Sequence, residues 1–200
     1  MTDFLAAAAI AFVAVLLVEL PDKTLVATLV LSTRYRRGPV LLGVSAAFAV
    51  QCVIAVTAGG LLRLLPQRLL ETIVAVLFGL GAFLLLRESG APDEEAEAAA
   101  NDPRDTSLSD LKVFSLSFGV LFAAEWGDAS QLATAGLVAK YGQPLAIGLG
   151  AFVALTGVAA MATFLGAVIL RRVPLHLVHR VAGMLFALFA LLAAVAAIRG

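Results

Sequence analysis

Long apolar stretches dominate the chain, and short polar segments separate them. Each stretch is at least about 18 residues long, and about 20 apolar residues in a helix cross the roughly 30 Å hydrocarbon core of a bilayer. The pattern therefore predicts an all-α integral membrane protein with six transmembrane helices. We place these helices at residues 4–31, 39–62, 68–87, 111–138, 144–170 and 174–198.

Charged residues interrupt this pattern at two places, "VELPDKT" (residues 18–24) and "AEWGDASQ" (residues 124–131). At 62% hydrophobic residues, the chain is too apolar for a soluble globule. Of its 14 acidic residues, eight lie in the segment 88–110 and four lie in the two interruptions. A carboxylate at the bilayer centre costs about 2.5–3.5 kcal/mol on insertion scales. The two interruptions are therefore the candidate functional motifs.

The two motifs occupy matching positions in two halves of the chain. At an offset of 106 residues, each motif supplies a Glu, an Asp and a hydroxyl residue in the same order. Because each half has three predicted helices, an odd number, the second half must enter the membrane from the opposite side. Inverted repeats of this kind are typical of secondary transporters. The matching pairs are Glu19 with Glu125, Asp22 with Asp128, and Thr24 with Ser130.

The repeat predicts the domain organisation and the topology. Residues 1–87 form the first three-helix repeat, residues 88–110 an acidic linker, and residues 111–200 the second, inverted repeat, with helices 1 and 4 broken at the motifs. Nine Lys and Arg residues fall on the side of the linker and four on the other side. The positive-inside rule then predicts a cytoplasmic linker and both termini outside. Because no targeting segment stands out, we expect a multi-pass protein of a bacterial plasma membrane.

The residue types in the motifs suit a hard divalent cation. Two carboxylates three positions apart share one face of a helix, and Pro21 and Gly127 weaken the helix between them and free backbone carbonyls. The candidate ligands are oxygen atoms of carboxylates, hydroxyls, carbonyls and the Gln131 amide, which favour Ca²⁺, Mn²⁺ or Mg²⁺ over zinc or copper. Carboxylates that lose protons when they bind a cation couple binding to proton release. The motifs therefore predict cation/proton exchange.

Two further polar residues, Gln51 and Thr156, lie inside predicted helices and align at an offset of 105. The sequence leaves open whether they line the cation site or only form hydrogen bonds between helices. We expect no resident cofactor beyond the transported cation. The expected partners are that cation, protons and the lipid bilayer, without nucleic acid, and the oligomeric state is left open.

Two other functions compete with cation/proton exchange. An intramembrane aspartyl protease would use Asp22 and Asp128 as a catalytic dyad, but it gives no role to Glu19 and Glu125. A passive divalent cation channel would conduct without moving protons. We therefore expect a transporter and not an enzyme.

The duplicated pattern Glu–x–Gly–Asp–(Lys/Arg)–(Thr/Ser) resembles the calcium/manganese–proton antiporter family, which includes Golgi transporters and bacterial manganese exporters. The resemblance covers the chain from Phe4 to Ile198. Pro21 departs from it where the family has glycine, and Ala129 departs where the second motif has Lys or Arg. The resemblance implies export of Mn²⁺ or Ca²⁺ from the cytoplasm in exchange for protons. It also implies one shared cation site, lined by Glu19, Asp22, Thr24, Glu125, Asp128, Ser130 and Gln131.

Overall fold

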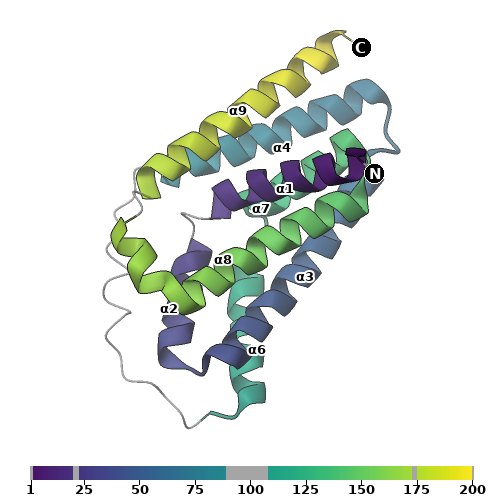
Figure 1. Cartoon of the computed structure of the whole chain (residues 1–200). Coiled ribbons are helices and arrows are strands. Elements are labelled where there is room, and N and C mark those ends of the chain that lie inside the picture. Colours follow the sequence, from purple (N-terminus) through teal and green to yellow (C-terminus); the bar gives the residue numbers. More distant parts are fainter. Residues whose placement is uncertain (1, 20–22, 89–107, 173–174, 200) are drawn as a thin grey trace.

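Every element in the described part of the chain is an α-helix. The structure, a computed structural model, describes residues 2–19, 23–88, 108–172 and 175–199, so most of the predicted linker 88–110 lies outside it. Figure 1 shows the helices arranged as one bundle. They are α1 (Thr2–Glu19), α2 (Lys23–Arg34), α3 (Arg37–Leu62), α4 (Gln67–Glu88), α6 (Asp110–Ala124), α7 (Ala129–Tyr141), α8 (Pro144–Arg172) and α9 (Leu175–Arg199).

Five of these helices, α1, α3, α4, α8 and α9, are long and apolar enough to cross a membrane. Helices α2, α6 and α7 have 12, 15 and 13 residues and are too short to do so alone. The prediction of an all-α membrane protein is confirmed. The predicted helix 111–138 is divided into α6 and α7, and the predicted helix 4–31 is divided into α1 and α2.

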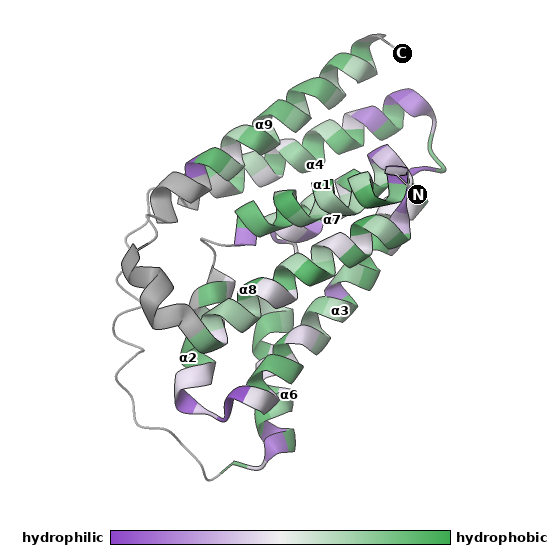
Figure 2. Ribbon diagram, viewed as in Figure 1, coloured by the Kyte–Doolittle hydropathy of each residue, from purple (hydrophilic) through white to green (hydrophobic). Residues whose placement is uncertain are grey.

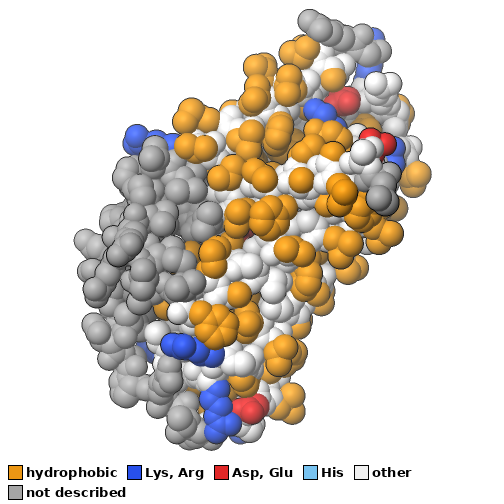
Figure 3. Space-filling view, in the orientation of Figure 1, with side chains coloured by type: hydrophobic (Ala, Val, Ile, Leu, Met, Phe, Trp, Pro, Cys, Tyr) orange, Lys and Arg blue, Asp and Glu red, His pale blue; other side chains and the backbone are white. Residues whose placement is uncertain are grey.

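The surface of the bundle is apolar where lipid would contact it. Leu42 and Val53 on α3, Phe83 on α4 and Leu191 on α9 each expose at least 60% of their area. Figure 2 shows hydrophobic residues along the outer helices, and Figure 3 shows charged side chains gathered near the two ends of the visible face. Exposed apolar surface is typical of sites of membrane or protein contact, and the five long apolar helices favour the membrane. The chain is therefore an integral membrane protein.

Two side-chain contacts join neighbouring elements at opposite ends of the bundle. At one end, Arg36 forms an ion pair of 2.8 Å with Asp110 at the start of α6. At the other end, Arg63 Nη1 donates a hydrogen bond of 3.3 Å to the carbonyl oxygen of Gly142. Figure 1 draws the N and C labels at the same side of the bundle, far from the start of α6. The predicted topology, with a cytoplasmic linker and both termini outside, stays a prediction.

Each short helix packs against a long helix of the other half of the chain. Helices α1 and α2 pack along α8, α6 and α7 pack along α3, and α4 and α9 lie side by side. The α3–α7 approach is so close that a Cβ atom on Gly59 would lie 2.4 Å from the carbonyl oxygen of Ala135. At the α4–α9 contact, the rings of Phe78 and Phe186 meet edge to face at 5.5 Å. The packing brings the ends of α1 and α6 together inside the bundle.

Candidate metal centre

The second motif lies at a break between two helices. Helix α6 ends at Ala124 with Glu125 as its C-cap, and α7 begins at Ala129 with Asp128 as its N-cap. Between the two caps, Gly127 has a φ of +77°, in the left-handed region that glycine adopts without penalty. The predicted break of helix 4 is therefore confirmed. It makes both carboxylates of the motif helix-terminal residues.

The first motif is described only in part. Helix α1 ends at Glu19 and α2 begins at Lys23, so a helix end also falls at this motif. Thr24 lies in the first turn of α2 and is fully buried. Two predicted features, the break-inducing Pro21 and the ligand Asp22, lie outside the described residues.

Three carboxylates from the two motifs form a cluster. Glu19, Glu125 and Asp128 each have one oxygen atom within 4.8 Å of an oxygen of each of the other two. Glu19 exposes 0% of its area and Glu125 exposes 4%, and Asp128 is half-buried. A cation that binds oxygen at about 2.3–2.6 Å keeps its ligands no more than about 5 Å apart. One ion can therefore contact all three carboxylates.

A hydrogen bond joins the two motifs directly. Thr24 Oγ1 on α2 donates to Glu125 Oε1 at the end of α6. The sequence analysis did not predict this bond between the hydroxyl of one motif and the glutamate of the other. Asp128 Oδ2 is buried and has no hydrogen-bond partner among the described residues. Such an atom is costly unless a proton or a cation satisfies it.

The C-terminal ends of α1 and α6 at the cluster favour a cation, whereas the N-terminal end of α7 beside Asp128 disfavours one. Helices α1 and α6 both terminate at a clustered glutamate. The C-terminus of a helix carries a partial negative charge of about half an elementary unit, concentrated on its unpaired carbonyl groups. Three neighbouring carboxylates also repel one another, which favours neutralisation of their charge by a bound cation. The arrangement can bind a divalent cation.

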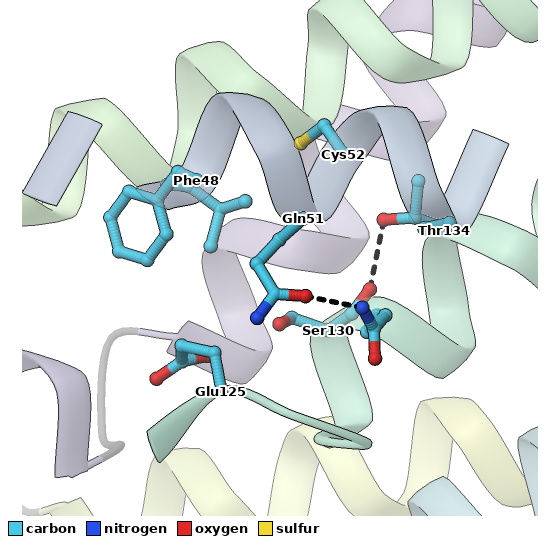
Figure 4. A pocket seen from close by; sticks show the side chains of 9 residues that line it. Phe48, Gln51, Cys52, Glu125, Ser130 and Thr134 are labelled. Carbon is cyan, nitrogen blue, oxygen red and sulfur yellow. Dashed lines mark hydrogen bonds between the residues drawn. The ribbon is translucent and has the colours of Figure 1, made fainter. Parts of the chain in front are cut away.

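Ser130 and Gln131, the remaining predicted ligands, lie in the first turn of α7 beside a small cavity (Figure 4). The cavity offers about 10 Å³, close to the roughly 10–15 Å³ that one water molecule needs. The Gln131 amide is already engaged: Oε1 accepts the Gly127 N–H at 2.9 Å, and Nε2 donates to Gln51 Oε1. The lining residues are Phe48, Gln51, Cys52, Ala55, Glu125, Ser130, Gln131, Thr134 and Leu155.

Gln51 combines the two roles that the sequence left open. It lines the cavity, and its Nε2 donates a hydrogen bond of 2.9 Å across helices to the carbonyl oxygen of Phe122. The Thr156 hydroxyl is buried without a hydrogen-bond partner in the described part of the chain. The sequence analysis missed Phe48 and Leu155 as lining residues, because nothing in an apolar helix distinguishes a cavity-facing position from a packed one.

Comparisons with known proteins identify the family of the chain. The family model of the divalent cation/proton antiporter GDT1 matches residues 7–93 and 113–200. The GDT1-like protein 5 of Arabidopsis thaliana is 31% identical over 197 residues, which cover 84% of this chain and 86% of the relative. A GDT1-like protein of Synechocystis sp. is 28% identical over 181 residues, covering 85% of this chain and 87% of the relative. The chloroplastic PAM71-homolog protein of Arabidopsis thaliana is 29% identical over 200 residues, covering 88% of this chain and 55% of the relative.

No solved structure matches the chain. The family model nevertheless covers most of its length, and both motif-bearing segments fall within the matched residues. The recognition made from the duplicated motif is confirmed: the chain belongs to the GDT1 family of divalent cation/proton antiporters.

Proposed function

We propose that the protein exports Mn²⁺ or Ca²⁺ from the cytoplasm in exchange for protons, through a single site at the carboxylate cluster. The observation that carries this proposal is the convergence of Glu19, Glu125 and Asp128, whose oxygen atoms lie within 4.8 Å of one another. The cluster draws on both halves of the chain, as a site between two moving repeats requires. We favour Mn²⁺ because the chain is short and resembles bacterial manganese exporters.

The proposed exchange follows from competition at the cluster. The cation requires ionised carboxylates, so its binding releases protons, and protonation from the other side of the membrane expels it. Thr24 holds one oxygen of Glu125 by a hydrogen bond, and we assign it and Ser130 to the cation site. We also include Asp22, by its equivalence to Asp128 at the offset of 106 residues.

The transport cycle that we propose uses two inverted three-helix repeats that rock about this site. The packing of α1 and α2 on α8, and of α6 and α7 on α3, supports the proposal because it relates the broken helices in the same way in both halves. The excess of Lys and Arg beside the linker supports a cytoplasmic linker and termini outside. A bacterial plasma membrane is the proposed location.

Purified protein in liposomes tests the proposal. The liposomes contain a pH-sensitive dye and an acidic lumen, and Mn²⁺, Ca²⁺ and Mg²⁺ are added outside in separate trials. We expect Mn²⁺, and to a lesser degree Ca²⁺, to enter while protons leave, and Glu19→Gln to stop both fluxes. Entry of labelled Mn²⁺ without proton movement would instead identify a passive channel.

A further inference from the structure

The break in the second motif leaves one backbone group on each side without a helical partner. In a continuous helix the Trp126 N–H would donate to the Phe122 carbonyl four residues earlier. Here it donates instead to the Ala123 carbonyl, at 3.4 Å. On the other side, the Gly127 N–H precedes α7 and is not part of it. The Phe122 carbonyl is part-buried and Gly127 is exposed, and a backbone group that loses its helical partner needs a substitute wherever water does not reach it.

Two glutamine side chains supply these partners. Gln51 Nε2 on α3 donates to the Phe122 carbonyl at 2.9 Å, and Gln131 Oε1 accepts the Gly127 N–H at 2.9 Å. The two amides also bind each other, since Gln131 Nε2 donates to Gln51 Oε1. A continuous path of three hydrogen bonds therefore runs from the end of α6, through α3, to the loop before α7.

We propose that Gln51 and Gln131 form a carboxamide bridge that fixes the helix break and so positions Glu125 and Asp128 for the cation. They are positioning residues, because their amides hold the backbone on both sides of the break. This inference rests on the proposed function of the carboxylate cluster. In this role Gln131 acts through the backbone, because its amide oxygen accepts the Gly127 N–H; the expectation that it is also a metal ligand stays a prediction.

The sequence of the first motif does not repeat the glutamine pair of this bridge. At the offset of 106, Leu25 stands where the second half has Gln131, and at the offset of 105 Thr156 stands where the first half has Gln51. Leu25 is fully buried against Val158 and Ala162. The two halves thus share the carboxylates but differ at the two positions that carry the amides of the bridge. Leu25 provides a matched control position for substitutions of Gln131.

Trp126 offers a direct probe of the bridged loop. It is the single tryptophan of the chain, it follows Glu125, and its ring centre lies 5.4 Å from that of Phe122. Its fluorescence therefore reports Mn²⁺ binding by quenching, and loop mobility by anisotropy in the absence of any cation. Both readouts work on detergent-purified protein and do not depend on transport.

The experiment compares Gln51→Met, Gln131→Met, the double variant and the control Leu25→Met. Methionine keeps the length of glutamine without its hydrogen bonds. We expect each single variant to weaken Mn²⁺ binding about tenfold, in the range known for groups that orient metal ligands. The double variant should bind Mn²⁺ as tightly as either single variant, because each substitution already breaks the same bridge. Trp126 anisotropy should fall in all three variants, and Leu25→Met should behave as wild type.

Two results would contradict the proposed bridge. If Trp126 anisotropy in Gln51→Met equalled that of wild type, the loop would not depend on the bridge. If the losses of Mn²⁺ affinity added up in the double variant, the two glutamines would be independent cation ligands. A failure of the proposed function gives a different pattern: Mn²⁺ quenching in wild-type protein would be absent, or would persist unchanged in Glu125→Gln. In that case the cation-free anisotropy of the glutamine variants still decides whether the bridge exists.

Discussion

The Thr24 hydroxyl donates a hydrogen bond to Glu125, although the two residues are 101 positions apart in the chain. Thr24 belongs to the first motif and Glu125 to the second, so this bond joins the two halves at the carboxylate cluster. A movement of one half relative to the other must lengthen it or break it. A change in the relative position of the halves would therefore change this bond at the carboxylate cluster.

We predict that Thr24→Val weakens cation binding by about 10- to 100-fold, because a hydrogen bond to a charged group contributes about 1.5–3 kcal/mol. Thr24→Ser keeps the hydroxyl and should restore most of the affinity. Titration of Mn²⁺ against Trp126 fluorescence measures both variants. Equal affinities in Thr24→Val and wild type would mean that this bond does not support the site.

Neutral isosteres at the cluster should abolish transport without unfolding the protein. Glu125→Gln and Asp128→Asn each remove a negative charge from a group whose oxygen atoms lie within 4.8 Å of the other two carboxylates. We expect Mn²⁺ uptake into liposomes to fall to the level of protein-free vesicles. Glu71→Gln on α4 is the matched control, because Glu71 lies outside the cluster, and it should transport as wild type. Normal uptake by both cluster variants would place the cation site elsewhere.

Gly127→Ala should strain the loop between α6 and α7. The φ of +77° at this position costs an L-residue roughly 1–2 kcal/mol, although open space surrounds the site of the missing Cβ. We predict a lower thermal midpoint and weaker Mn²⁺ binding. Gly119→Ala is the control, because it adds the same methyl group in open space within helix α6 and improves helix propensity. A stabilised Gly127→Ala variant would contradict the left-handed conformation.

Gly59→Ala should disturb the α3–α7 contact, since its Cβ would lie 2.4 Å from the Ala135 carbonyl oxygen. Backbone cannot yield as a flexible side chain can, and overpacking of this kind costs typically about 1–3 kcal/mol. The neighbouring Gly60→Ala has open space around its Cβ and should be tolerated. Thermal unfolding in detergent, followed by circular dichroism, compares the two variants. Equal stability of both would show that α3 and α7 do not approach so closely.

Much of the fold was predictable because a membrane helix is encoded locally. The apolar run 39–62 differs from α3 by two residues at its start and none at its end, and the glycine in "EWGD" marked the break between α6 and α7. The same motifs identified Glu19, Glu125 and Asp128 as candidates for one cluster.

The contacts between elements were not predictable in the same way. Neither the Thr24–Glu125 bond nor the Gln51–Gln131 bond follows from any periodicity, because both depend on how distant helices pack. The offset of 105 marked Gln51 as a position of interest, but it did not show that its amide would bind the Phe122 carbonyl. That role appears only once the break has freed the carbonyl.

Proton release on cation binding tests the central claim most directly. Purified wild-type protein and Glu125→Gln are mixed with Mn²⁺ in weakly buffered detergent solution, and the protons released per bound ion are counted with a pH indicator. We predict that wild-type protein releases protons as it binds Mn²⁺ and binds it less tightly in more acidic solution, since cation and protons compete for the same carboxylates. Glu125→Gln should bind little and release few protons. Tight Mn²⁺ binding without proton release, unchanged in Glu125→Gln, would contradict the account.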